Sequence, residues 1–264
     1  MDSVTGKATL NIAGARIEMV RRGQGRAILF LHPHIGMHGS DALIEHLARH
    51  AEVIAPSHPG FGHSELPRGM NSVDDLSYFY LDLIEQLDLR EVVVVGASFG
   101  GWIAAEIATK TTERLSRLIL IGALGAKFGA RDQSDIVDIF ATPPGRWEEL
   151  SFRNPALWQR DYAALPDDEL TAIARNREAT AHFAWNPYMY NPKLRDRLHR
   201  IRIPTLVLWG VHDDFAPLAY GKSYCAAIPG AIFEQVAEAG HFPHIEQPAK
   251  VAQRVIEFGL TQQT

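Results

Sequence analysis

The sequence predicts an α/β fold, in which helices cover both faces of a mostly parallel sheet of eight strands. Short apolar runs alternate with segments whose apolar residues recur at helical spacing, and this rhythm is typical of repeated β-α units. The connections between these segments are short and rich in glycine, proline and histidine. A chain of 264 residues with 46% hydrophobic content is also long enough to bury one sizeable core.

The first half of the chain supplies five of the expected strands. Residues 8–21 alternate in polarity around a turn at Ala13-Gly14, which predicts an antiparallel hairpin at a sheet edge. Further strands are expected at 27–31, 53–55 and 92–95, with helices after Ser40 and from about Val73 to Leu87. In the first of these helices the buried face is formed by Leu43, Ile44 and Leu47.

The rest of the chain supplies three more strands, at 118–122, 204–210 and 232–236, and a closing helix near 248–258. Roughly eighty residues separate the first two of these strands, which is too long for one crossover helix. This segment is rich in aromatic residues, and its prolines divide it into several short helices. We therefore predict a helical cap at residues 125–198, inserted into a core domain formed by residues 1–124 and 199–264.

Charge and cysteine content narrow the class of function. The net charge of −5 provides no cationic field for nucleic acid or an anionic membrane surface, so we expect a small-molecule substrate. Cys225 is the only cysteine, which rules out an intramolecular disulfide and favours a buried apolar thiol. Residues 1–7 lack a signal-peptide pattern, and no apolar stretch reaches spanning length. We expect a soluble cytoplasmic protein, either a monomer or a homodimer.

The stretch from Val92 to Ala108 predicts the reactive centre. Four consecutive valines are typical of a strand buried on both faces, and a helical pattern begins directly after Gly96-Ala97-Ser98-Phe99-Gly100. In such a Gly-x-Ser-x-Gly turn the glycines let strand and helix backbones approach closely around a strained serine. We expect Ser98 to project its hydroxyl from this turn, beside the unpaired N–H groups of the helix N-terminus.

An activated serine needs a base, and the base needs a partner that fixes its tautomer. Asp213 follows the predicted strand at 204–210, and His241 follows the strand at 232–236. Because the carboxyl ends of parallel strands meet at one edge of a sheet, both side chains are expected near Ser98. Asp214, His212 and His244 are the neighbouring alternatives.

These motifs together resemble those of the α/β-hydrolase superfamily, and the resemblance covers about Ala8 to Phe258. It implies that Ser98 is the nucleophile, His241 the general base and then the general acid, and Asp213 the orienting acid. The order serine, aspartate, histidine is the order that accompanies this turn in the superfamily. The resemblance implies neither a metal nor an organic cofactor.

The oxyanion hole requires two donors. One is the backbone N–H of Phe99, at the start of the helix. Family members often have His-Gly-x after the strand that corresponds to 27–31, and residue x gives the second N–H. Here the sequence reads His32-Pro33-His34, and proline has no N–H, so His34 becomes the expected second donor, with Ile35 as the alternative.

A metal site is the competing interpretation of this loop, since His32, His34 and His38 are potential ligands. No cysteine or carboxylate joins them at ligand spacing, so we favour a His32 that packs and forms hydrogen bonds beneath the loop.

The cap aromatics predict the substrate. We expect an apolar chamber for small to medium, uncharged, moderately hydrophobic groups. Its expected lining is Ile35, Trp147, Trp158, Phe183, Trp185 and Phe242. The favoured function is hydrolysis of carboxylic esters. The alternatives are a carbon–carbon bond hydrolase of ring-fission products, with a cap arginine for the substrate carboxylate, and a non-catalytic ligand receptor. The available cap arginines are Arg153, Arg160, Arg175 and Arg177.

Overall fold

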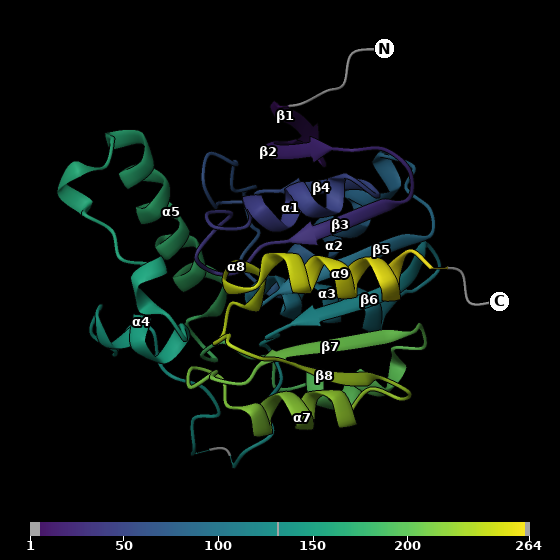
Figure 1. The fold of residues 1–264 in the computed structure, drawn as a ribbon. Coiled ribbons are helices and arrows are strands. Elements are labelled where there is room, and N and C mark those ends of the chain that lie inside the picture. The colour runs from purple at the N-terminus through teal and green to yellow at the C-terminus, as the bar shows by residue number, and fades with distance from the viewer. Residues whose placement is uncertain (1–5, 131, 262–264) are drawn as a thin grey trace.

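A computed structural model describes residues 6–130 and 132–261 and contains one eight-stranded sheet (Figure 1). The strands are β1 (Gly6–Ile12), β2 (Ala15–Arg22), β3 (Ala27–Leu31), β4 (Glu52–Pro56), β5 (Val92–Ala97), β6 (Leu115–Ile121), β7 (Thr205–Gly210) and β8 (Ile232–Val236). Their order across the sheet is β1-β2-β4-β3-β5-β6-β7-β8. The pairs β1–β2 and β2–β4 are antiparallel, and the other neighbours are parallel. The predicted fold class is confirmed.

Helices cover both faces of the sheet. One face carries α1 (Asp41–Ala48) and α9 (Pro248–Gly259), and the other carries α2 (Val73–Gln86), α3 (Phe99–Lys110) and α7 (Leu218–Ala226). A short helix, α8 (Pro243–Glu246), precedes α9. Each face encloses its own cluster of buried apolar side chains, which separates the core into two layers.

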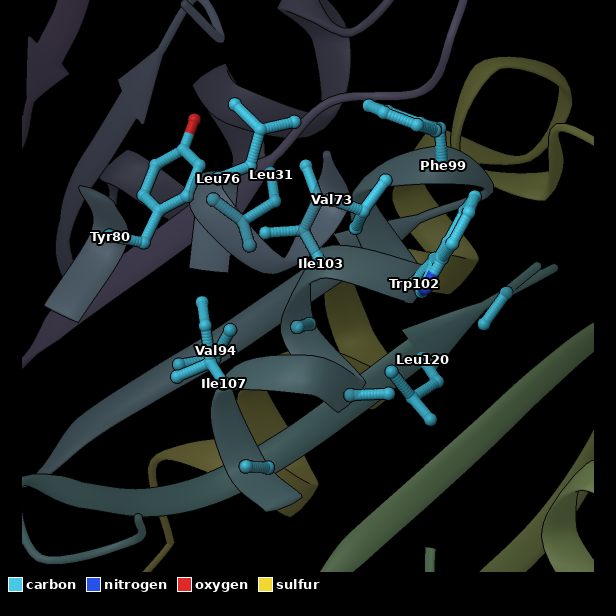
Figure 2. Close-up of a cluster of buried hydrophobic side chains, with 14 of the residues drawn as sticks. Leu31, Val73, Leu76, Tyr80, Val94, Phe99, Trp102, Ile103, Ile107 and Leu120 are labelled. Carbon is cyan, nitrogen blue, oxygen red and sulfur yellow. The ribbon is translucent and has the colours of Figure 1, made fainter. Parts of the chain in front are cut away.

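The central strand β5 contributes to both layers because successive side chains of a strand point to opposite faces. Val94 belongs to the cluster beneath α2 and α3, whereas Val93 and Val95 belong to the cluster beneath α1 and α9. Figure 2 shows Ile103 and Ile107 of α3 in the first of these clusters, close to Val94. The start of α3 is therefore fixed against the sheet from which Ser98 emerges.

A helical segment lies between β6 and β7. It comprises α4 (Arg146–Ser151), η1 (Pro155–Leu157), η2 (Tyr162–Ala164), α5 (Asp167–Ala184), α6 (Leu194–Arg197) and η3 (Leu198–Arg200). In Figure 1, α4 and α5 lie beyond the carboxyl ends of the parallel strands. Leu194 and Leu198 are fully buried in the core cluster that includes α3, so α6 and η3 return to the core. The domain limits at residues 124 and 199 stay a prediction.

None of the helices in residues 6–130 and 132–261 has both the length and the hydropathy that a membrane span requires.

Candidate active site

Ser98 occupies the turn between β5 and α3 in a conformation that non-glycine residues rarely adopt. Its φ angle is 52° and its ψ angle is −114°. Two glycines make the turn possible, because a Cβ atom on Gly96 would lie 2.4 Å from the carbonyl oxygen of Gly100, and one on Gly100 would lie 2.1 Å from that of Leu31. The hydrogen bond from Ser98 N–H to the Ile121 carbonyl, 2.8 Å, ties the turn to β6.

Ser98, His241 and Asp213 form a continuous chain of hydrogen bonds. Nδ1 of His241 lies 2.8 Å from Oδ2 of Asp213, and Nε2 of His241 lies 2.9 Å from Oγ of Ser98. A carboxylate only accepts hydrogen bonds, so Nδ1–H of His241 donates to Asp213 and Nε2 accepts from the Ser98 hydroxyl. The backbone N–H of Ala216 donates to the other carboxylate oxygen of Asp213, at 2.7 Å. The loops after β7 and β8 thus bring both predicted partners to Ser98.

Burial shapes the electrostatics of these three hydrogen-bonded residues. Desolvation raises the pKa of the Asp213 carboxyl, while the charge and hydrogen bond of His241 and the backbone hydrogen bond of Ala216 oppose the shift. Because Asp213 is only 4% exposed, its interaction with His241 is screened little by solvent. The carboxylate is therefore well placed to stabilise an imidazolium at His241.

The neighbouring alternatives lie elsewhere. Asp214 and His212 are exposed. His244 is fully buried beside the rings of Phe30 and Phe242, and neither ring nitrogen has a hydrogen-bond partner among the described residues. Burial lowers the pKa of His244 to about 3, with a further contribution from His241. The hydrogen bonds that reach Ser98 through His241 and Asp213 include none of these three residues.

Three residues outside the predicted site position His241. The carbonyl of Ser151, at the end of α4, accepts the backbone N–H of His241 at 2.7 Å. The ring of Phe215 lies 4.5 Å from the His241 ring, centroid to centroid. Gly122 follows β6 with a φ angle of 54°, and a Cβ atom there would lie 2.8 Å from the His241 carbonyl oxygen. The sequence signal for Gly122 is its place directly after an apolar strand.

His34 approaches Ser98 through its side chain, which the sequence did not reveal. Nδ1 of His34 lies 3.2 Å from Oγ of Ser98. Since the Ser98 hydroxyl donates to His241, its oxygen accepts from Nδ1–H of His34. The Thr180 hydroxyl of α5 shares its single hydrogen between the His34 carbonyl, at 3.1 Å, and the Asn176 carbonyl, at 2.7 Å, and so links the loop to α5. The role of the His34 and Phe99 backbone N–H groups as oxyanion donors stays a prediction.

The His34 imidazole is neutral at physiological pH. Burial lowers its pKa to about 3, and the nearby His241 and His32 add to the effect. Its ring stacks on Phe215 with a centroid distance of 5.8 Å. Ser98 has no exposed surface, and the His34 ring lies against its hydroxyl.

His32 supports this loop from below, as expected. Its Nδ1 lies 2.7 Å from the Pro33 carbonyl, and its Nε2 accepts the backbone N–H of His58 at 2.9 Å. The His58 ring stacks on the His32 ring, 3.6 Å between centroids, and its Nε2 lies 2.8 Å from the His32 carbonyl. Backbone partners therefore occupy both ring nitrogens of His32. Within the described part of the chain, no three metal-ligating side chains are grouped to hold an ion.

A cavity of about 300 Å³ lies between the loop after β3 and the inserted helices. His34 forms part of its wall, whereas Ser98, His241 and Asp213 do not. Of the expected lining, Ile35, Trp147 and Trp158 border this cavity. Phe183 and Phe242 do not, because they are buried in apolar clusters, and Trp185 does not, because it is 62% exposed. Residues that the prediction missed include Glu148, Asn176 and Thr180.

A larger cavity of about 780 Å³ lies between residues 126–129 and 132–136 on one side and 186–196 on the other, and its wall includes none of the candidate catalytic side chains.

Comparison with known proteins identifies related chains. The model of the Alpha/beta hydrolase family matches residues 28–254. The 2-hydroxymuconate semialdehyde hydrolase of Pseudomonas sp. (strain CF600) is 26% identical over 93% of this chain and 91% of its own length. Two solved structures have similar folds. A meta-cleavage product hydrolase from Pseudomonas fluorescens has a TM-score of 0.74 at 22% identity, covering 95% of this chain and 96% of its own. An esterase from Thermogutta terrifontis has a TM-score of 0.75 at 23% identity, covering 96% and 97%.

The matched region extends from β3 to α9 and includes the turn at Ser98 and the loops that carry Asp213 and His241. The chain belongs to the alpha/beta hydrolase family.

Proposed function

We propose that this protein is a serine hydrolase that cleaves carboxylic esters of small to medium size through an acyl-enzyme on Ser98. The observation that carries the proposal is the continuous chain of hydrogen bonds from Asp213 through His241 to Ser98. His241 is in the tautomer that general base catalysis needs, because its Nε2 carries no hydrogen and can take the serine proton.

In the proposed mechanism, Oγ of Ser98 attacks the ester carbonyl as Nε2 of His241 removes its proton. Asp213 stabilises the imidazolium that forms. The protonated His241 then gives the proton to the leaving alcohol, and the C–O bond of the ester breaks. Water, deprotonated by the same imidazole, attacks the acyl-enzyme and releases the carboxylic acid with Ser98 restored.

The developing oxyanion needs fixed donors. We assign this role to the backbone N–H groups of Phe99 and His34. As the first residue of α3, Phe99 has an N–H without a helical carbonyl partner, and the helix dipole favours negative charge there. His34 belongs to the loop after β3, and β3 is the neighbour of β5 in the sheet.

The test is hydrolysis of short 4-nitrophenyl esters by the wild type and by Ser98→Ala. We expect the substitution to lower kcat by about a thousandfold or more, with an unchanged thermal unfolding temperature. Equal turnover by the two proteins would reject a role for Ser98. No turnover by a folded wild type would favour a non-catalytic ligand receptor.

Carbon–carbon bond hydrolysis of a ring-fission product is the second candidate. Two cap arginines, Arg160 and Arg177, border the cavity, and such a substrate carries a carboxylate that an arginine binds well. The name of the Pseudomonas relative also refers to a substrate of this kind. Loss of the absorbance of a coloured ring-fission dienoate, measured beside ester turnover, distinguishes the two activities.

A further inference from the structure

We infer that the preferred acyl group carries an uncharged polar end with both a hydrogen-bond donor and an acceptor, bound between Glu148 and Arg160. The simplest such group is a primary carboxamide. The inference rests on the proposed function, since it describes the substrate of the same site. Both residues border the 300 Å³ cavity, whose wall also contains His34, the residue with Nδ1 3.2 Å from Oγ of Ser98.

Glu148 is a carboxylate without a partner. It lies on α4 and borders the cavity. Its Oε2 is buried, and no described residue donates a hydrogen bond to it or forms an ion pair with its side chain. The adjacent Glu149 behaves differently, because it is exposed and pairs with Arg146 at 2.9 Å. A buried carboxylate oxygen that lacks a donor is costly unless a ligand supplies one.

Arg160 is the complementary group on the same wall. Its side chain is only 9% exposed, and its guanidinium lies 4.4 Å from the Trp158 ring centroid. Nε is buried without a partner, and the nearest carboxylate, Glu169, is 3.8 Å away. No described residue accepts a hydrogen bond from this guanidinium, and its donors are therefore available to a ligand. Trp147 adds a second unpartnered donor, Nε1.

Glu148 and Arg160 border one cavity and have opposite charges, yet they form no ion pair with each other in the described structure. A group that donates to Glu148 and accepts from Arg160 would bridge them and satisfy both. A carboxamide does so with its NH₂ and its carbonyl oxygen. An apolar group of the same shape would leave both charged groups unpaired in the filled cavity, and a site built for hydrogen bonds rejects such analogues.

The charge balance favours an uncharged group over a carboxylate. Glu169 lies 3.8 Å from Arg160 and offsets part of its charge. Arg177, the other arginine in the cavity wall, is exposed, and solvent screens its charge. A carboxylate in place of the carboxamide would have no hydrogen to donate to Glu148, and Glu148 would repel it because like charges at short range repel. The polar end therefore matches the cavity best when it carries no net charge.

The experiment compares three 4-nitrophenyl esters that differ only at the acyl end. The glutaramate ends in a carboxamide, the 5-methylhexanoate is its apolar isostere, and the glutarate ends in a carboxylate. We expect wild-type kcat/KM to be at least about tenfold higher for the glutaramate than for either other ester, which corresponds to one well-placed polar contact.

Glu148→Gln and Arg160→Met should each lower the ratio of kcat/KM for glutaramate to that for 5-methylhexanoate by about tenfold. Glu149→Gln and Arg153→Gln are the matched controls. They change the same residue types on neighbouring exposed positions, and the ratio should stay at the wild-type value. Thermal unfolding of each variant checks that the fold is retained.

Equal kcat/KM for glutaramate and 5-methylhexanoate, a preference for the glutarate, or an unchanged ratio in both cavity variants would each overturn the inference. Calorimetric binding of the same esters to Ser98→Ala separates this outcome from failure of the proposed function. Tighter binding of the glutaramate without any wild-type turnover would support the polar subsite and reject the esterase. Ester turnover by the wild type without tighter binding of the glutaramate would support the esterase and reject the polar subsite.

Discussion

His34 has a contact with Ser98 that its position in the sequence does not reveal. The loop after β3 could be predicted to face Ser98, because parallel strand ends share one edge of the sheet. The Nδ1 atom lies 3.2 Å from Oγ because the ring packs on Phe215 and the backbone carbonyl is held by Thr180, and both residues are far away in the chain. The sequence therefore predicts the residue and leaves its side-chain contact open.

His34→Ala should speed the reaction of Ser98 with a fluorophosphonate probe. Ser98 has no exposed surface, and the ring must move before the probe phosphorus reaches Oγ. If the displacement costs about 1.4 kcal/mol, its removal raises the second-order labelling rate about tenfold. The reaction is quenched in aliquots at successive times, and intact-protein mass spectrometry gives the labelled fraction from which the rate is calculated. A slower rate in His34→Ala would mean that the imidazole assists the reaction and does not obstruct it.

At the scale of elements, the sequence predicts the strands and the loops that follow them more accurately than it predicts the contacts of the cap. Four valines predict β5 because consecutive β-branched residues suit a strand buried on both faces, and β5 begins at Val92 as expected. The cap aromatics carry no such signal. Phe183 and Trp185 are two residues apart, so they point to different sides of the helix end, and their contacts depend on tertiary packing.

Gly122→Ala should lower kcat through the position of His241. The new Cβ would lie 2.8 Å from the His241 carbonyl oxygen, and the loop must shift. We expect a loss of about tenfold or more, as small displacements of a catalytic base are costly. Gly230→Ala is the control, because Gly230 also has positive φ but has no atom within 4 Å of its Cβ position. Equal kcat in both variants would contradict this account.

The whole molecule buries several neutral histidines, and this makes its stability depend on pH. Burial lowers the pKa of His32 to about 4 and those of His34 and His244 to about 3. In the unfolded chain histidine titrates near 6.5. As the pH falls below this value, the unfolded chain binds protons that the folded protein excludes. The free energy of unfolding therefore decreases until the pH reaches the folded-state pKa values.

Urea denaturation at several pH values between 7 and 5 measures this effect. Each buried histidine should contribute a slope of about 1.4 kcal/mol per pH unit below pH 6. Asp213 opposes this effect, because burial raises the pKa of its carboxyl and the folded protein therefore binds that proton before the unfolded chain does as the pH falls. His244→Met should remove one such contribution, whereas the exposed His50→Asn should not. A free energy of unfolding that stays constant from pH 7 to 5 would refute the buried neutral state.

The claim that Ser98 is the nucleophile is tested most directly by mapping the adduct of a fluorophosphonate probe. The labelled protein is digested, and peptide mass spectrometry locates the modified residue. The chain of hydrogen bonds from Asp213 to Ser98 predicts one adduct, on Ser98, that is lost in Ser98→Ala and strongly reduced in His241→Ala. An adduct on another residue, or no adduct on the folded wild type, would contradict the account.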